Sequence, residues 1–300
     1  MITRAHGCMA HDTTNELVYL MGGRTDPDPQ QSNDESSTNL IEIWNQSTET
    51  RSLAQFSMPN AQQYHECVQI DDKIYAIGDW YPGVTPSQKS TGQVQIYDLT
   101  TSSWQGTTFS MPATKEVGNF GMTSIGQKIY IAGGVQDSNA NDATDRLLEY
   151  DTVTGLWTEL ANMSEKRFAF PLVEYHGLLY AFGGIQGPYT WNSKPVLNTS
   201  EVYDPSTNTW TQLPNMSFHR FGMAATVHND EIILIGGHSK SGAVKDTWGY
   251  VPTSNEWRKM DDLLIGIFDL AAIDADGVTV FAGGDLSSQP YSGGWGTQYL

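Results

Sequence analysis

The stretch Glu201–Gly237, EVYDPSTNTWTQLPNMSFHRFGMAATVHNDEIILIGG, decides the fold because it recurs, with changes, along the whole chain. It contains Tyr203-Asp204, a polar turn, Trp210, a Met216-Ser217 break, and an apolar run that ends at Gly236-Gly237. Internal repeats with a period of roughly 20–50 residues are typical of solenoids and propellers. The repeat therefore predicts the architecture before any single motif is considered.

Glycine pairs that follow short apolar runs set the period. They lie at Gly22-Gly23, Gly133-Gly134, Gly183-Gly184, Gly236-Gly237 and Gly283-Gly284, with Gly78-Asp79 in the second repeat. Short apolar runs bounded by turn residues and rich in Ile, Val, Tyr and Phe indicate buried strands. Since glycine has no Cβ, we expect a neighbouring aromatic ring to pack on bare backbone at each pair.

Tyrosine and tryptophan keep the same phase as the glycine pairs. Tyr-Asp occurs at Tyr97, Tyr150 and Tyr203, and a Trp follows at Trp104, Trp157, Trp210 and Trp257. Each repeat offers four short strands, which in the fourth repeat lie near 170–175, 179–182, 201–203 and 210–213. Such sheets bury both faces when they stand side by side around an axis. The sequence predicts an all-β, six-bladed propeller in a single domain, with blades at about 1–57, 58–110, 111–162, 163–215, 216–259 and 260–300.

Gly-Gly, Tyr-Asp and a following Trp at this period resemble the kelch repeat over essentially the whole chain. Departures are Asp79 in the second glycine pair, Arg51 in place of the first Trp, and Val251 in place of the Asp after Tyr250. The resemblance implies a kelch-type propeller. In kelch-like proteins the face that carries the long loops usually holds partners.

The sixth repeat ends at Tyr299-Leu300, in its third strand. We expect a last blade of three strands, or a chain that is a fragment of a longer protein, or a stub strand contributed by Met1–Thr3. Ring closure is then expected to depend on face packing between the first and last blades.

The composition limits the classes of partner and the compartments that we expect for this chain. The formal net charge of −18 makes nucleic acid an unfavourable partner. No apolar run is long enough to span a membrane. Asn-x-Ser/Thr sequons begin at Asn45, Asn162, Asn198 and Asn215, a number that chance explains in this composition. We therefore expect a cytoplasmic protein, or a secreted one if an upstream signal precedes this sequence.

The chain has only Cys8 and Cys67, which lie in equivalent strands of neighbouring repeats. Their spacing permits a disulfide without requiring it, and two reduced thiols are the default prediction.

Aromatic and basic residues gather in the long loops and at the starts of inner strands. Aromatic residues with a few arginines are typical of protein interfaces, and Trp or Tyr faces also suit sugar rings. The alternative is that the tryptophans cover blade tops, and that Arg167 and Arg220 bond loop carbonyls of the next blade. The predicted ligand-binding residues are Arg4, Trp80, Tyr81, Arg167, Tyr189, Trp191, His219, Arg220, His238 and Tyr291.

Polar residues also occur where inner strands approach the axis, at His6, His65, Glu66, Asn119 and Asp269. The resemblance to kelch-type sialic-acid mutarotases, which use Arg and Glu near the channel, makes Glu66, Arg167 and Arg220 catalytic candidates. Asp269 is a further candidate, because a carboxylate and a His that converge in a cleft can serve acid–base chemistry. The alternative is that these residues only face channel water. We predict no cofactor and no metal site.

Three functions are therefore open. The first is an interaction module for a protein segment or peptide, or for a glycan. The second is a carbohydrate-active enzyme of mutarotase, epimerase or lyase type. The third is a structural part of a larger kelch protein.

Overall fold

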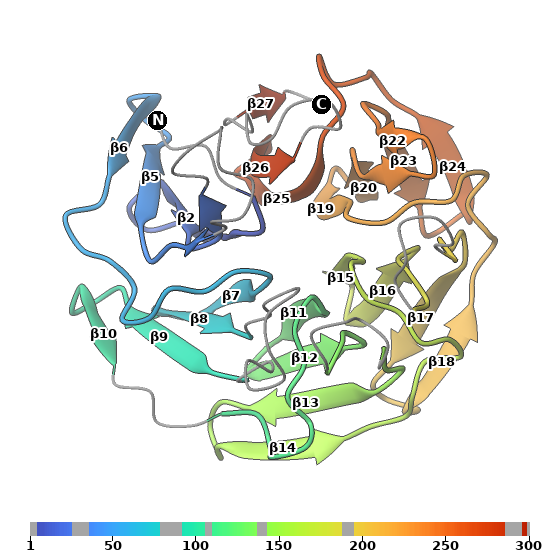
Figure 1. The fold of residues 1–300 in the computed structure, drawn as a ribbon, viewed down its shortest axis with the longest axis horizontal. Helices are drawn as coiled ribbons and strands as arrows, with labels where there is room; N and C mark the ends of the chain where they lie inside the picture. Colours follow the sequence, from blue (N-terminus) through green and yellow to red (C-terminus); the bar gives the residue numbers. More distant parts are fainter. Residues whose placement is uncertain are drawn as a thin grey trace.

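The computed structural model describes residues 5–25, 36–78, 92–105, 110–136, 143–187, 195–285 and 296–298. These residues form antiparallel sheets that stand around a central axis (Figure 1). The described ranges contain no α-helix. The predicted all-β propeller is confirmed.

Five sheets have four strands each, and their strand order follows the chain from the axis outward. The first contains β1 (Cys8–Asp12), β2 (Leu17–Met21), β5 (Ile41–Asn45) and β6 (Thr50–Leu53). The second contains β7 (Glu66–Ile70), β8 (Lys73–Ile77), β9 (Val94–Asp98) and β10 (Ser103–Gln105). The third contains β11 (Gly121–Ile125), β12 (Lys128–Ala132), β13 (Leu147–Asp151) and β14 (Leu156–Glu159).

The fourth sheet contains β15 (Leu172–Tyr175), β16 (Leu178–Phe182), β17 (Ser200–Asp204) and β18 (Thr209–Gln212). The fifth contains β19 (Ala224–His228), β20 (Glu231–Ile235), β23 (Thr247–Val251) and β24 (Glu256–Lys259). A three-stranded sheet, β25 (Phe268–Ala275), β26 (Val278–Asp285) and β27 (Gly296–Gln298), lies between the fifth and first blades (Figure 1).

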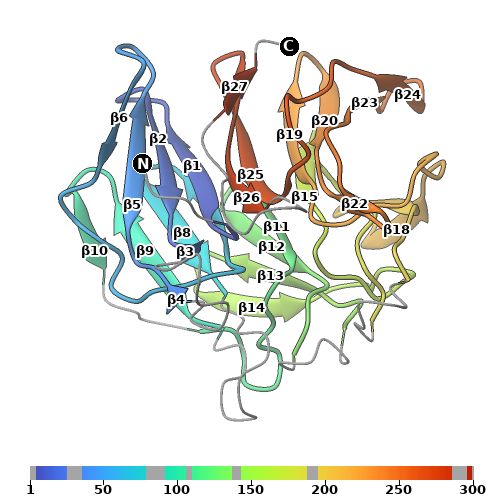
Figure 2. The same ribbon diagram turned by 45° about the horizontal axis from the view of Figure 1, so that its top comes forward.

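The strands run so that the long connections share one face. The first two strands of a blade are joined by short turns, such as Asp71-Asp72 between β7 and β8. The second and third strands are joined by long segments, two of which contain small hairpins, β3 (Arg24–Thr25) with β4 (Ser36–Ser37) and β21 (His238–Ser239) with β22 (Gly242–Ala243). In Figure 2 the short turns between β19 and β20 point upward, away from β3 and β4. We call the side with the long connections the long-loop face.

A closed ring of six backbone hydrogen bonds surrounds the channel at the long-loop face. Each member donates its N–H to the carbonyl of the previous one, at 2.7–3.2 Å, and the ring closes from His6 N–H to Asp269 O. All six members have a positive φ between 52° and 61°. The members of this mouth ring are His6, Tyr64, Asn119, Ala169, Gly222 and Asp269.

The mouth ring changes the prediction for ring closure. Face packing does join the first blade to the three-stranded sheet, through a cluster that includes Trp44, Leu20 and Val280. The bond from His6 N–H to Asp269 O adds a main-chain link at the same seam. Closure by face packing alone was therefore an incomplete prediction, because the sequence did not show that the inner strands bond end to end.

The glycine pairs bring neighbouring blades into contact. A Cβ on Gly133 would lie 2.3 Å from the carbonyl oxygen of Arg167 in the next blade and 2.8 Å from the ring of Phe170. The second glycine of that pair, Gly134, donates its N–H to the same Arg167 carbonyl. The expected aromatic ring on bare backbone is present, but the neighbouring carbonyl imposes the stricter limit on side-chain size.

The Tyr-Trp landmarks pack as cross-strand pairs on the third and outer strands. Tyr203 lies opposite Trp210, and their ring centroids are 5.2 Å apart. Trp210 also reaches the third blade, since its Nε1–H donates to the Ala161 carbonyl at 2.9 Å. The pairs therefore stabilise each blade and also join it to its neighbour.

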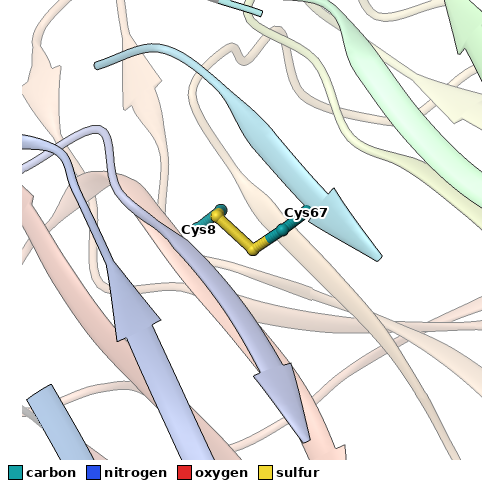
Figure 3. The surroundings of a disulfide bond; sticks show 2 residues. All are labelled: Cys8 and Cys67. Atoms are coloured by element: carbon teal, nitrogen blue, oxygen red, sulfur yellow. A yellow bond between two sulfur atoms is a disulfide. The ribbon is translucent and has the colours of Figure 1, made fainter. Parts of the chain in front are cut away.

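The two cysteines form a disulfide between β1 and β7, with Cα atoms 5.5 Å apart (Figure 3). The default prediction of two reduced thiols is wrong. The inner strands of adjacent blades converge toward the axis, which brings the two side chains within bonding distance.

Candidate functional site: the mouth of the central channel

Inner strands from all six sheets enclose a cavity of about 250 Å³ on the axis. Its wall includes apolar groups such as Met122, Phe170 and Leu270. The five polar residues predicted near the axis all line it: His6, His65, Glu66, Asn119 and Asp269. Three of these belong to the mouth ring, so the polar end of the cavity faces the long loops.

Glu66 contributes a carboxyl group to the cavity wall at the start of β7. Burial raises the pKa of this carboxyl to about 8. Glu66 is therefore largely protonated at neutral pH, and it can donate a hydrogen bond to a ligand or act as an acid.

A charged cluster lies at the seam between the first blade and the three-stranded sheet. His6 Nδ1 is 3.5 Å from Asp269 Oδ2, and His6 Nε2 is 3.5 Å from Asp285 Oδ2. The Arg24 guanidinium approaches Asp285 Oδ2 at 3.3 Å. His6 and Arg24 hold the pKa of Asp285 below its usual value even though burial raises it.

Arg167 lies inside the fourth blade, with no exposed surface. Its Nη2 donates to Glu201 Oε1 at 2.7 Å, and its Nη1 donates to the Gly183 carbonyl at 2.8 Å. Burial lowers the pKa of the guanidinium, and Glu201 opposes that shift. The side chain therefore holds a glycine pair of its own blade in place.

Arg220 repeats this arrangement in the fifth blade. It donates to the Gly236 carbonyl at 3.4 Å and to Asp246 Oδ2 at 3.0 Å. Gln62 does the same in the second blade, donating to the Gly78 carbonyl at 2.7 Å. Each of these side chains donates to a carbonyl of its own blade, so the predicted bond from Arg167 and Arg220 to the next blade is wrong. The contact between blades is made by the backbone carbonyls of Arg167 and Arg220, which accept from the glycine pair of the preceding blade.

The four catalytic candidates are thus divided. Glu66 and Asp269 line the cavity, whereas Arg167 and Arg220 do not. The Arg–carboxylate pair expected from the mutarotase resemblance is not brought together by these four residues.

The remaining ligand-binding predictions have different outcomes. His219 is exposed on a blade-to-blade connection. His238 is half-buried against Phe221 and Phe268, with ring centroids 4.9 Å and 4.8 Å away. The others lie outside the described residues: Arg4, Trp80, Tyr81, Tyr189, Trp191 and Tyr291.

An apolar pair projects from the long-loop face just before β25. Leu264 is 101% exposed and Ile265 is 51% exposed. The Leu263 N–H donates to Lys245 O, and in the preceding blade the Met216 N–H makes the equivalent bond to Asn198 O. Leu263 therefore takes the place of the repeated Met, and Leu264 takes the place of Ser217. The repeat predicts Met260-Asp261 as the counterpart of Met216-Ser217, and this prediction is wrong.

This geometry can be compared with known proteins. The Attractin/LZTR1 beta-propeller model matches residues 4–246. The chain belongs to this family of kelch-type propellers. The resemblance predicted from the glycine, tyrosine and tryptophan landmarks is confirmed.

Several curated proteins resemble this kelch-type propeller. Human Kelch-like protein 15 is 25% identical over 258 residues, which is 80% of this chain and 40% of that protein. Mouse Kelch-like protein 36 is 33% identical over 116 residues, covering 38% of this chain and 18% of that protein. Beta-scruin of Limulus polyphemus is 27% identical over 188 residues, which is 62% of this chain and 20% of that protein. The chain thus spans less than half the length of these relatives.

A solved structure shares the fold. The structure of YjhT superposes with a TM-score of 0.77 at 14% identity, covering 99% of this chain and 98% of that one. At this identity the likeness shows the fold alone. No helix in the described part of the propeller has the length and apolar character needed to cross a membrane.

Arg24 and Asp285 were not among the predicted site residues. Both directly follow a glycine pair, a place that Val135 and Ile185 occupy in the third and fourth blades. A charge at a position that is apolar in equivalent repeats is the signal that could have found them.

Proposed function

We propose that this kelch-type propeller is an interaction module that binds a protein segment on its long-loop face. The long second-to-third connections and all blade-to-blade connections share this face, and long loops on a rigid scaffold commonly carry binding residues. Kelch propellers are typically protein-interaction modules, which agrees with the relatives named above.

The observation that carries the proposal is the exposed pair Leu264 and Ile265. An equivalent turn in another blade presents Ser217 at the position of Leu264. A leucine with a fully exposed side chain gains apolar burial only when a partner covers it.

The net charge of −18 favours a basic partner. We therefore propose an extended peptide with Lys or Arg beside an apolar side chain. A glycan is the alternative ligand.

A peptide array and a glycan array, both probed with the labelled chain, test the proposal. We expect basic, apolar-containing peptides to bind, and Leu264→Asp/Ile265→Asp to weaken binding at least about tenfold. The matched control is Val153→Asp/Leu156→Asp, which changes two exposed apolar residues on the opposite face, one in the turn between β13 and β14 and one at the start of β14. Equal binding by both double variants would reject this face, and binding confined to the glycan array would reject a protein partner.

One observation favours a second candidate function, a carbohydrate-active enzyme. The protonated Glu66 carboxyl in the cavity has the pKa of a group that can transfer protons near neutral pH. Turnover of a sugar anomer by the chain, lost in Glu66→Gln, would support this function over the first.

We further propose that the three-stranded sheet acts as a sixth blade of one domain over 1–300, divided at the boundaries given above. Asp269 supplies the sixth member of the mouth ring, which supports this interpretation. The Cys8–Cys67 disulfide supports an oxidising compartment over the cytoplasm as the place where the chain works. Mass spectrometry of the native protein for free thiols at both cysteines tests that choice.

A further inference from the structure

We propose that His6, Asp269 and Asp285 form a binding site for a divalent first-row transition-metal ion, with Zn²⁺ as the representative. One ligand atom from each residue can be chosen so that all three atoms lie within 4.8 Å of one another. His6 belongs to the first blade, and both aspartates belong to the three-stranded sheet. A bound ion would therefore join the two ends of the ring.

The distance from each ring nitrogen of His6 to the carboxylate that it faces fits a pair of metal ligands and is longer than an ordinary charge-assisted hydrogen bond. Both His6–carboxylate separations are 3.5 Å. Charge-assisted hydrogen bonds are shorter, about 2.7–2.9 Å. Two ligands at about 2.1 Å from a tetrahedral Zn²⁺ are about 3.4 Å apart. Another His–Asp pair in the protein has the distance of an ordinary hydrogen bond, with His228 Nδ1 lying 2.7 Å from Asp274 Oδ2.

The imidazole is already held in a fixed orientation. The His6 side chain is only 3% exposed, and its ring stacks on Tyr64 with centroids 3.7 Å apart. Its Nδ1 faces Asp269 and its Nε2 faces Asp285, so an ion on either nitrogen keeps one carboxylate near and requires the other to rotate toward it. The main-chain bond from His6 to Asp269 keeps the two residues together.

The ligand set selects the class of ion. One imidazole nitrogen with two carboxylates suits Zn²⁺, Co²⁺, Ni²⁺ or Mn²⁺, whereas Mg²⁺ and Ca²⁺ prefer oxygen ligands throughout. His6 and Asp269 also line the central cavity, which leaves room for water or a small ligand at the remaining coordination positions. Arg24 competes with the ion because its guanidinium contacts Asp285.

Isothermal titration calorimetry tests the site, with ZnCl₂ or CoCl₂ added to the chelator-treated chain that contains the Cys8–Cys67 disulfide. We expect one ion per chain, a rise in melting temperature with either metal, and no comparable rise with MgCl₂ or CaCl₂. His6→Gln and Asp285→Asn are each expected to lower the affinity at least roughly tenfold. The matched control, His228→Gln, removes the histidine of the pair with Asp274 and is expected to leave the affinity unchanged.

Arg24→Gln separates a metal site from a charge network. Removing the competing cation is expected to raise the Zn²⁺ affinity several-fold, whereas a pure network would only lose stability. If the His6 or Asp285 variant does not fold, anomalous scattering from crystals of the wild-type chain soaked in ZnCl₂ locates the ion directly. No Zn²⁺ binding by the wild type at millimolar metal, or a peak elsewhere with none at His6, would overturn the proposal.

Discussion

Arg167 places a positive charge inside the fourth blade, and Glu201 is the carboxylate that balances it. Arg167→Met should lower the free energy of unfolding by about 3–5 kcal/mol, because it leaves Glu201 buried without its partner. Urea denaturation checks this value. Arg258→Met is the control, since Arg258 is 55% exposed in its pair with Glu231 and should cost less than about 1 kcal/mol. Similar small losses in both variants would contradict the structural role of Arg167.

Glu66 should make stability depend on pH. Its pKa is about 8 in the folded protein against 4.5 as the ordinary value, so the folded state holds the proton more tightly. Stability is therefore expected to fall as the pH rises from about 4.5 to 8 and to level off above that range. Glu66→Gln removes this dependence and should be more stable than the wild type at pH 8.5, by about 1–3 kcal/mol.

Urea denaturation at several pH values measures the Glu66 effect. The exposed residue Glu256 provides the control, since Glu256→Gln should leave the pH profile of the wild type unchanged. Parallel profiles for Glu66→Gln and the wild type would show that the Glu66 carboxyl is ionised in the folded protein.

The polar residues near the axis were predictable from the sequence, but their contacts were not. All five predicted polar channel residues line the cavity, because a repeat fixes where each inner strand begins. The sequence did not decide between a structural and a ligand-binding role for Arg167, because a long side chain at this repeat position can point either into the blade or toward a ligand. Its acceptors include Gly183, which directly follows β16, and Glu201 in β17, and repeat spacing does not specify side-chain direction.

At the scale of elements, the glycine pairs should tolerate no side chain. Gly133 has a φ of 64°, and its Cβ would meet the Arg167 carbonyl at 2.3 Å. Gly133→Ala should therefore cost about 2–4 kcal/mol, from backbone strain and overpacking together. Gly126→Ala isolates the strain, because Gly126 has a φ of 56° with nothing within 4 Å of its Cβ position, and it should cost about 1 kcal/mol.

Thermal and urea unfolding of the two alanine variants measure this difference. Equal losses would mean that the neighbouring blade moves aside, and that the pair is kept for backbone conformation alone.

The strands themselves were predictable because each is short, apolar and bounded by turn residues. In the fourth blade the predicted segment 179–182 corresponds to β16, and 201–203 lies within β17. The boundary before β25 was not predictable in the same way. Leu263 replaces the repeated Met there, so the nearby Met260 gave a false register.

For the whole molecule, the number of repeats fixes the ring but not the way in which its ends are joined. Six copies of the inner strand predict six places around an axis. The charged cluster at the seam depends on His6, Asp269, Asp285 and Arg24, and the other repeats do not carry this set of side chains at the equivalent positions. The repeat therefore predicted face packing at the seam, whereas the contacts within the cluster could not be predicted because no other repeat contains them.

The disulfide should stabilise the whole ring, because it joins the innermost strands of two blades across 59 residues of chain. Cys8→Ser/Cys67→Ser is expected to lower the free energy of unfolding by about 2–4 kcal/mol, mainly by freeing the unfolded chain. Urea denaturation of the wild type with and without dithiothreitol, compared with the double variant, measures the effect. Dithiothreitol should lower the stability of the wild type toward that of the variant and leave the variant unchanged. A wild type that is insensitive to the reductant and contains two free thiols would show that the bond does not form in the native protein, and would remove the argument for an oxidising compartment.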